Sequence, residues 1–357
     1  MSADGLEKAQ AALESTIQEL FAEQKETYHY GEWFEPLYFD LAEYVGRKGK
    51  RVRPLMFLLS YKAFGGPLPL DHPSLLRCAT ALELLHTFIL IHDDVIDRSD
   101  TRRSLPTYHK LVERRINAFE GSERIGENVA VVMGDIVFAM ALRVLHRADF
   151  DPALRSKVMD RFLGYTADTG VGEIYDILFG VRDIAQLPAE EIERMYHLKT
   201  TRYTFEAPCV MGAILAGAPD AKVEALRRVT DPLGLAFQIQ NDLAECKFSD
   251  PMQLASCTDL LEGKKTLVVR CAFDRLDEVD RSFLQLCLNS ARRTESTLVK
   301  LRDLILKSGA LETMKVRAAE LFSRAAQEVD SGVFSPEESS QIHEAVRLIR
   351  QQARVSV

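Results

Sequence analysis

Residues 79–97 read ATALELLHTFILIHDDVID, and this stretch decides the predicted fold class. Residues 79–91 would be apolar on almost every face of a helix, and residues 128–145 (NVAVVMGDIVFAMALRVL) share that character. Helices that are apolar all round lie at the centre of a bundle, with other helices packed outside them. Polar residues on such a helix must be paired or face a cavity, which directs attention to the HDDVID segment at its end.

The remainder of the chain also has helical periodicity. Apolar residues recur at three- and four-residue steps near its start, as in Leu6, Ala9, Leu13 and Ile17. Residues 335–338 (SPEE) combine an N-cap serine, a proline at the first helical position and a capping glutamate. The sequence has no sustained apolar–polar alternation and no linker long enough to separate independent domains. We expect one all-α domain over residues 1–357, with a helical extension at residues 1–30.

The composition argues against several classes of protein. Among 357 residues, 45 Lys and Arg stand against 53 Asp and Glu, and the net charge of −8 disfavours general binding of nucleic acid. The first residues lack the apolar core of a signal peptide, and no apolar run approaches the roughly eighteen residues of a membrane span. The six cysteines form no C-x-x-C pair, so neither a disulfide framework nor a zinc site is indicated. We expect a soluble, cytoplasmic protein without a membrane span.

Residues 92–97 (HDDVID) carry the first chemical signal. If the helix continues through them, Asp93 and Asp97 lie one turn apart on the same face, where their carboxylates converge. Two ionised carboxylates in a part-buried site repel each other unless a cation lies between them. Mg²⁺ suits this arrangement, because it takes one or two carboxylates together with the phosphate oxygens of a substrate. The alternative is a solvated helix end with a chance cluster of aspartates.

Cationic residues on both sides of this segment favour a phosphate-bearing substrate. Arg102 and Arg103 follow the carboxylates closely, and guanidinium groups match phosphate oxygens. Residues 48–54 (KGKRVRP) concentrate cations in an otherwise acidic protein, and their glycine permits close backbone approach. His86 lies two turns before Asp93 on nearly the same helical face. The alternatives are a solvated basic surface and a histidine satisfied within the core.

In this combination and order, the motifs resemble those of the trans-polyprenyl diphosphate synthases, the farnesyl and geranylgeranyl diphosphate synthase group of the isoprenoid synthase family. The resemblance covers the motif-bearing region, residues 48–266. Each motif alone is weak, whereas the whole set in order is specific. The matching elements are residues 49–54, His86, residues 93–97, Arg102-Arg103, Lys199-Thr200, Phe237-Gln238 and residues 263–266 (GKKT).

The resemblance implies an all-α bundle around a deep central cavity (the type I isoprenoid synthase fold), a homodimer, and Mg²⁺ as cofactor. The implied reaction joins isopentenyl diphosphate head-to-tail to an allylic diphosphate. By position, the residues that hold isopentenyl diphosphate are Lys50, Arg53, His86 and Arg103. Those that hold the allylic diphosphate are Arg102, Lys199 and Lys264, and those that bind its Mg²⁺ ions are Asp93 and Asp97. The neutral groups that face the allylic cation are Thr200 and Gln238.

The chain departs from the family pattern at its second acidic motif. Residues 237–245 read FQIQNDLAE, so Asn241 replaces the aspartate that would bind a third Mg²⁺, and Glu245 offers a carboxylate one turn later. A neutral amide adds no charge, so we expect a working synthase with a raised Mg²⁺ requirement. Glu173 stands where many relatives carry glutamine and adds negative charge near this site. Ser104 replaces a common glycine, with little expected effect.

Two residues upstream of Asp93 are candidates for the floor that limits product length. Helical projection places Ile89 about 40° from Asp93 and Phe88 about 140° away, which favours Ile89 as the wall. By resemblance, an aromatic residue at position 88 is typical of the geranylgeranyl type. We expect geranylgeranyl diphosphate as the product. Farnesyl diphosphate is the alternative product, and core packing is the alternative role of Phe88.

Two other classes of function remain open. A class I terpene cyclase shares the fold and the first acidic motif, but it does not need the residues that hold isopentenyl diphosphate. A catalytically silent partner subunit would explain Asn241, whereas the complete first acidic motif argues against it. Outside the motifs, Trp33 and Tyr44 are interpreted as packing residues.

Overall fold

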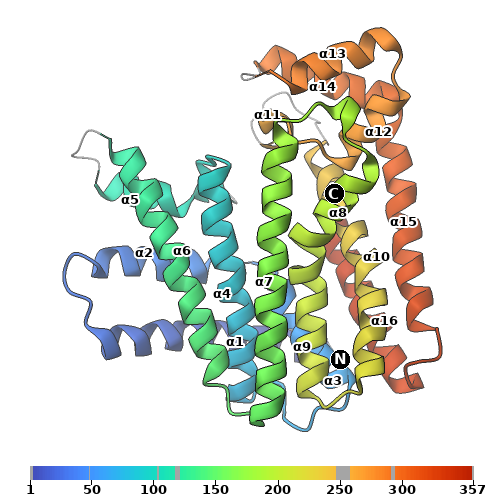
Figure 1. Ribbon diagram of the computed structural model, residues 1–357. Coiled ribbons are helices and arrows are strands. Elements are labelled where there is room, and N and C mark those ends of the chain that lie inside the picture. Colours follow the sequence, from blue (N-terminus) through green and yellow to red (C-terminus); the bar gives the residue numbers. More distant parts are fainter. Residues whose placement is uncertain are drawn as a thin grey trace. The chain divides into compact units, whose positions relative to one another are not determined.

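The two apolar stretches form long helices that pack against each other, α4 (Pro73–Ile96) and α6 (Ser122–His146) (Figure 1). The ring of Phe88 lies 5.0 Å from that of Phe138, and His92 Nε2 lies 3.0 Å from the carbonyl oxygen of Val131. Residue numbers rise along one helix as they fall along the other, so α4 and α6 are antiparallel. The predicted central position holds for α4, whose apolar window is mostly buried, whereas α6 exposes apolar side chains such as Val132.

The computed structural model describes residues 3–47, 49–102, 104–116, 121–246, 258–290 and 294–355, and the chain forms two compact units. Unit 1 comprises residues 1–160 and 214–217, and unit 2 comprises residues 161–213 and 218–357. Besides α4 and α6, unit 1 contains α1 (Ala3–Tyr28), α2 (Glu35–Gly46), α3 (Val52–Ala63), α5 (Tyr108–Arg115) and a two-stranded ribbon of β1 (Thr101–Arg102) and β2 (Leu105–Pro106). The organisation of the chain as one domain stays a prediction.

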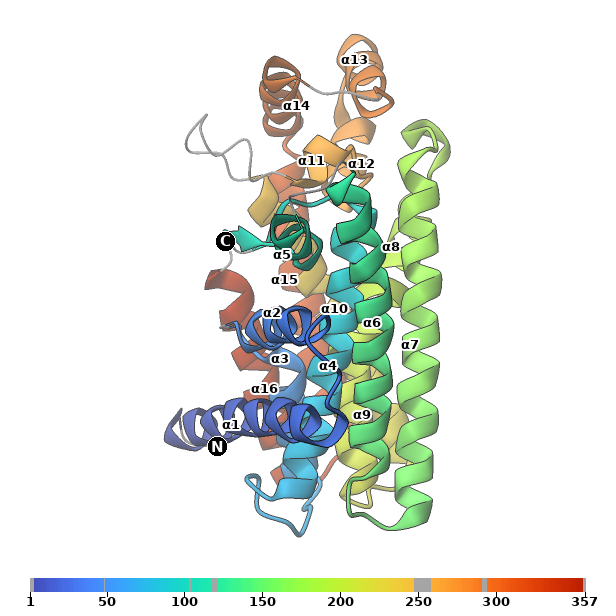
Figure 2. The same ribbon diagram turned by 90° about the vertical axis from the view of Figure 1, so that its left-hand side faces the viewer.

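Unit 2 is built around α10 (Asp220–Glu245), which packs mainly against α15 (Ala310–Val329). Figures 1 and 2 show these two helices side by side. Helix α7 begins in unit 1 and runs on into unit 2, where most of it lies. Helix α7 spans Pro152–Gly180. The elements that follow it, besides α10 and α15, are η1 (Ile184–Gln186), α8 (Ala189–Tyr196), the π-helix η2 (His197–Glu206), α9 (Ala207–Leu215), α11 (Thr258–Glu262), α12 (Leu267–Arg275), α13 (Glu278–Leu288), α14 (Glu295–Ser308) and α16 (Pro336–Val355).

Capping residues set several helix ends where the sequence predicts them. Glu338 Oε2 accepts a hydrogen bond from the backbone N–H of Ser335 at 2.7 Å, and Ser335 Oγ accepts one from the N–H of Glu338 at 3.3 Å. This reciprocal pair satisfies backbone donors that the first turn of α16 would otherwise leave without partners. The predicted capping box is confirmed.

Among the described residues, the β1–β2 ribbon is the only strand pairing, and the predicted all-α fold is confirmed. By length and composition, α4 and α6 are long and apolar enough to cross a membrane. In α4, 72% of the apolar window is buried within the protein, as in the core helix of a soluble protein, and in α6 the share is 44%. The expected absence of a membrane span stays a prediction.

Candidate active site

The predicted Mg²⁺ ligands Asp93 and Asp97 lie at the C-terminal end of α4. The helix extends to Ile96, and the backbone N–H of Asp97 donates to the carbonyl of Asp93 at 2.8 Å. The helix therefore continues through the motif, as the one-turn spacing of the two carboxylates requires. Unsatisfied carbonyls give a helix end a partial negative charge. Two carboxylates at such an end are unfavourable without a counter-ion, so this end of α4 suits a divalent cation.

Asp94, which lies between Asp93 and Asp97 in the sequence, is buried and holds two side chains against the motif. It accepts hydrogen bonds from Tyr44 Oη at 2.9 Å and from Arg102 Nε at 2.7 Å. Burial raises the pKa of the Asp94 carboxyl, and the Arg102 guanidinium opposes that rise. Arg102 Nη2 also donates to Asp93 Oδ2 at 3.1 Å. The guanidinium predicted to hold the allylic diphosphate therefore lies directly against the acidic motif.

Tyr44 is a member of this cluster that the sequence does not reveal. Its hydroxyl donates to a carboxylate that lies 50 residues away in the chain, so the interpretation of Tyr44 as a packing residue is incomplete. Trp33, interpreted in the same way, has 89% of its surface exposed, so that interpretation is wrong within the described chain. No local sequence signal separates these two aromatic residues, because their surroundings come from distant segments.

Arg102 is held by the β1–β2 ribbon, in which it pairs with Leu105. Ser104, in the turn of the ribbon, has a φ of +63°, in the left-handed region that glycine adopts most easily. A non-glycine residue costs about 1 kcal/mol in that region, and the expectation that Ser104 has little effect stays a prediction. Arg103, predicted to hold isopentenyl diphosphate, lies outside the described residues.

The other residues predicted to hold isopentenyl diphosphate lie on two elements of unit 1. Lys50 is exposed in the segment before α3, and Arg53 is half-buried in the first turn of α3. His86 is half-buried on α4, against which α3 packs. Arg51, which lies between Lys50 and Arg53, is buried. The cations of residues 49–54 therefore differ in exposure to solvent: Arg51 is buried, whereas Lys50 is exposed and Arg53 is half-buried.

In unit 2, Lys199 and Thr200 lie in the π-helix η2, which continues α8 without a break. The π-helix is a rare conformation that is frequently found at functional sites, and η2 extends it over ten residues. Lys199 Nζ contacts Glu173 Oε2 at 2.8 Å and Asp176 Oδ2 at 2.7 Å, both on α7. Glu173 therefore places its negative charge directly against Lys199, a residue predicted to hold the allylic diphosphate.

The position of η2 depends on two further contacts. Gly172 on α7 lies so close to η2 that a Cβ added to it would be 2.3 Å from the backbone nitrogen of Lys199. At the other end of η2, buried Glu206 accepts hydrogen bonds from Tyr165 Oη at 2.9 Å and from Arg227 Nε at 2.6 Å. The first contact sets how closely Lys199 approaches α7, and the second anchors the end of the π-helix.

Gln238 on α10 is oriented by Asp242, a buried carboxylate that the sequence motifs do not mark as a site residue. Gln238 Nε2 donates to Asp242 Oδ1 at 2.9 Å, and the Tyr196 hydroxyl donates to Asp242 Oδ2. Burial raises the pKa of the Asp242 carboxyl to about 8, and the nearby Asp259 charge adds to the rise. Tyr196 Oη in turn accepts the backbone N–H of Leu267 at 3.0 Å. This network fixes which way the Gln238 amide points.

Asn241 and Glu245 occupy the last turn of α10, which ends at Glu245. The second acidic motif therefore also lies at the negative end of a helix. Across the described residues, no group of three or more His, Cys, Asp or Glu side chains is arranged to hold a metal by itself. Two oxygen-bearing side chains at each helix end fit Mg²⁺ whose coordination is completed by substrate phosphates and water.

The two lysines of residues 263–266 have different surroundings. Lys264 is partly exposed and contacts Glu262 at 3.0 Å. Lys265 has 3% of its surface exposed, and its Nζ donates to the carbonyl of Gly180, the last residue of α7, at 2.6 Å. Lys265 therefore caps a helix end, and Lys264 is the lysine of this pair that suits a diphosphate.

The two candidate residues for product length lie on different sides of α4. Phe88 packs towards α6, with its ring 5.0 Å from Phe138 and 4.7 Å from His92. Ile89 is half-buried. The aromatic contacts fit the packing alternative for Phe88, and the role of either residue in chain length stays a prediction.

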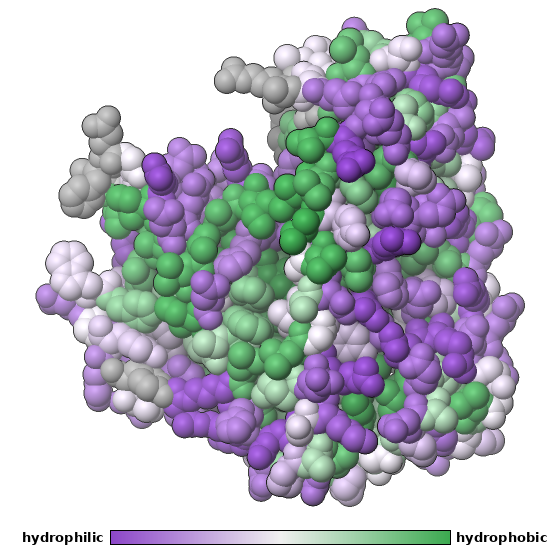
Figure 3. All heavy atoms as spheres, in the orientation of Figure 1, coloured by the Kyte–Doolittle hydropathy of each residue, from purple (hydrophilic) through white to green (hydrophobic). Residues whose placement is uncertain are grey.

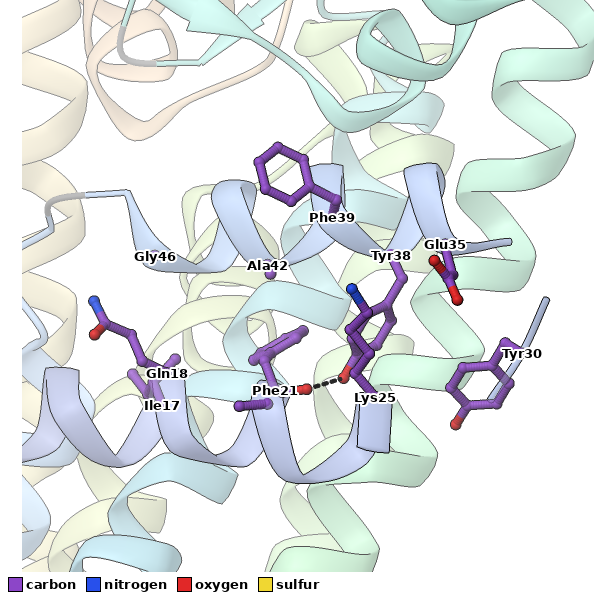
Figure 4. A pocket seen from close by; sticks show the side chains of 11 residues that line it. Ile17, Gln18, Phe21, Lys25, Tyr30, Glu35, Tyr38, Phe39, Ala42 and Gly46 are labelled. Atoms are coloured by element: carbon purple, nitrogen blue, oxygen red, sulfur yellow. Dashed lines mark hydrogen bonds between the residues drawn. The ribbon is translucent and has the colours of Figure 1, made fainter. Parts of the chain in front are cut away.

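A cavity of about 270 Å³ in unit 1 lies between α1 and α2 (Figure 4). Its walls include Phe21 and Tyr38, whose hydroxyl donates to the carbonyl of Phe21 at 3.2 Å. None of the predicted site residues lines this cavity. It is therefore distinct from the candidate active site.

The sequence model of the family described as polyprenyl synthetase matches residues 35–305. The chain belongs to the polyprenyl synthetase family. It is 31% identical over 247 residues to a geranylgeranyl diphosphate synthase of Methanosarcina mazei, an alignment that covers 69% of this chain and 70% of that protein. The family resemblance drawn from the motifs is thereby confirmed.

Solved structures of other polyprenyl synthetases share the fold. A geranylgeranyl pyrophosphate synthase from Corynebacterium glutamicum, complexed with isoprenyl diphosphate and magnesium, superposes with a TM-score of 0.87 at 26% identity, over 97% of this chain and 99% of that one. A decaprenyl diphosphate synthase from Rhodobacter capsulatus superposes with a TM-score of 0.76 at 24% identity, over 98% of each chain. The fold is thus common to synthases named for products of different length.

Proposed function

We propose that this polyprenyl synthetase is a prenyltransferase that condenses isopentenyl diphosphate with an allylic diphosphate to give geranylgeranyl diphosphate. The observation that carries the proposal is the contact of Arg102 with Asp93 at the end of α4. A ligand that suits both a guanidinium and a pair of metal-binding carboxylates is a diphosphate bound together with Mg²⁺. The names of the relatives at about 30% identity support the same reaction.

The first task of the site is to stabilise a leaving group. When the allylic C–O bond breaks, an allylic cation forms and negative charge develops on the diphosphate oxygens. Fixed cations aimed at those oxygens stabilise that charge more than they stabilise the ground state. Arg102, Lys199 and Lys264 are the cations that we assign to this task.

Mg²⁺ would be held by Asp93 and Asp97 on α4 and by Asn241 and Glu245 on α10. When bound, it supplies Lewis-acid stabilisation of the leaving diphosphate. The pair on α4 carries two negative charges, whereas the pair on α10 carries one because Asn241 is neutral. A weaker Mg²⁺ affinity at the second pair follows, and with it a raised Mg²⁺ requirement.

The second task is to direct the allylic cation to the isopentenyl double bond. Thr200 and Gln238 present neutral dipoles, which stabilise positive charge without reacting with it. The Asp242 contact that orients the Gln238 amide supports this assignment. Lys50, Arg53 and His86 hold isopentenyl diphosphate. After the new C–C bond forms, a proton leaves the former isopentenyl unit, and the released diphosphate accepts it.

Two further properties belong to the proposal. Large apolar side chains are exposed along α7 and on α6, and Figure 3 shows apolar side chains gathered over both helices. Burial of these exposed apolar side chains against a second copy of the chain would remove them from water, and we infer a homodimer. No disulfide joins any of the five described cysteines, which supports a reducing, cytoplasmic location.

The decisive experiment incubates the protein with isopentenyl diphosphate, Mg²⁺ and each allylic diphosphate of five to fifteen carbons in turn, and measures product length. We expect a twenty-carbon diphosphate and no diphosphate release without isopentenyl diphosphate. A fifteen-carbon end product would replace the assignment by farnesyl diphosphate synthase. Diphosphate release from the allylic substrate alone would indicate a terpene cyclase, and no turnover at any Mg²⁺ concentration would indicate a silent subunit.

A further inference from the structure

Arg51 differs from the cations on either side of it. Lys50 is exposed and Arg53 is half-buried, whereas Arg51 has 5% of its surface exposed. Its backbone is also unusual, because Arg51 caps α3 with φ 45° and ψ 40°, in the left-handed region that L-residues rarely adopt. A long cation held in a strained backbone and removed from water requires strong compensating contacts.

Those contacts occupy all three nitrogens of the guanidinium. Nη1 donates to Glu83 Oε1 at 2.5 Å, and Nε and Nη2 donate to the two carboxylate oxygens of Glu14 at 2.8 and 3.0 Å. Nη2 also donates to the backbone carbonyls of Val45 at 3.0 Å and of Arg47 at 3.2 Å. One side chain therefore ties together α1, the end of α2 and α4. Because its nitrogens are engaged in this way, Arg51 is not placed to bind a diphosphate as its neighbours are.

The contact with Glu83 connects the two elements that hold isopentenyl diphosphate. Glu83 is buried on α4 and lies three residues before His86, on an adjacent face of the helix. Lys50 and Arg53 lie one residue before and two residues after Arg51. A displacement of Arg51 relative to Glu83 therefore changes the spacing of Lys50 and Arg53 relative to His86.

We propose that Arg51 is a positioning residue that acts through Glu83 to set the spacing of Lys50 and Arg53 relative to His86, and so controls affinity for isopentenyl diphosphate. The proposal rests on the proposed function. Arginine is needed because its planar fork meets two carboxylates and two carbonyls at once, whereas a lysine ammonium is a single point charge. The allylic diphosphate is assigned to other residues, so its binding should respond little.

The test compares Arg51→Lys and Glu83→Gln with the wild type in steady-state kinetics, in which isopentenyl and allylic diphosphates are varied separately. Displacement of binding groups by about 1 Å can change rates by about a hundredfold. For a smaller displacement, we expect KM for isopentenyl diphosphate to rise about tenfold. KM for the allylic diphosphate should stay within about twofold. The double variant should be no worse than the worse single variant, because the positioning acts through the Arg51–Glu83 contact that each single change already breaks.

Arg115→Lys is the matched control. Arg115 also forms an ion pair between two helices of unit 1, α5 and α2, with Asp40 at 2.5 Å, and this pair lies outside residues 49–54. We expect the same chemical change there to leave both KM values unaltered. Circular dichroism and thermal unfolding of each variant show whether it is folded.

The outcomes distinguish failure of the proposed function from failure of the positioning role alone. Wild-type protein that transfers no prenyl group overturns the proposed function and this inference with it. If the wild type is active, parallel rises in both KM values overturn the positioning role alone. Loss of stability at unchanged KM, or failure of both single variants to fold, would show that Arg51 serves only to hold unit 1 together.

Discussion

Replacement of Gly172 by alanine should displace Lys199 and impair catalysis. A Cβ at position 172 would lie 2.3 Å from the Lys199 nitrogen, 2.6 Å from its Cα and 2.8 Å from the carbonyl carbon of Leu198. These atoms belong to the backbone, so no side-chain rotation can relieve the clash. Ordinary contact begins near 3.4 Å, and η2 must therefore move away from α7 by about 1 Å.

The magnitude follows from that displacement. Overpacking of this kind typically destabilises a protein by about 1–3 kcal/mol, and the gain from replacing a helical glycine offsets about 0.5–1 kcal/mol of it. The displacement also moves Lys199 relative to Glu173 and Asp176, which now contact its ammonium group. A catalytic group misplaced by about 1 Å lowers the rate by up to about a hundredfold, so we expect kcat to fall by about ten- to a hundredfold.

The assay is kcat and KM for the allylic diphosphate, together with the free energy of unfolding in urea. Gly170→Ala is the matched control, because Gly170 lies on the same helix and an added Cβ there meets nothing within 4 Å. That variant should be stabilised by about 0.5–1 kcal/mol with unchanged kcat. Wild-type kcat and stability in Gly172→Ala would refute the inference that this close approach positions Lys199.

Three more predictions concern individual residues. Asn241→Asp restores a charge at the second acidic motif and should lower the Mg²⁺ concentration that gives half-maximal rate by about tenfold; an unchanged Mg²⁺ titration would contradict a metal-binding role for position 241. Phe88→Ala should lengthen the product beyond twenty carbons, as measured by chromatography of the dephosphorylated product, and an unaltered product would assign Phe88 to packing against Phe138 alone. Ser104→Gly relieves a left-handed backbone with φ +63° and should raise the free energy of unfolding by about 0.5–1 kcal/mol, whereas no gain would mean that the turn relaxes without strain.

Features that depend on neighbouring residues in the chain are predictable from this sequence. The capping box at Ser335 and Glu338 forms as predicted, because serine, proline and glutamate at these spacings meet only within one helical turn. The one-turn relation of Asp93 and Asp97 holds for the same reason. The all-α fold follows from apolar periodicity, which requires no knowledge of distant partners.

Features that depend on distant segments are not predictable in this way. Tyr44 and Trp33 are both aromatic residues near the start of the chain, yet one donates to Asp94 and the other is exposed to solvent. The buried position of Arg51 is equally hidden, since nothing local distinguishes it from the basic residues around it. Contacts between residues far apart in the sequence decide these roles, and such contacts form only when the helices pack together.

The placement of both acidic motifs at the negative ends of helices α4 and α10 also bears on local unfolding of those ends. Like charges concentrated there favour local unwinding of the last turns when the ionic medium lacks divalent cations and substrate. Bound Mg²⁺ and diphosphate should therefore slow proteolysis within these last turns, because ligands that bind only the folded form stabilise it.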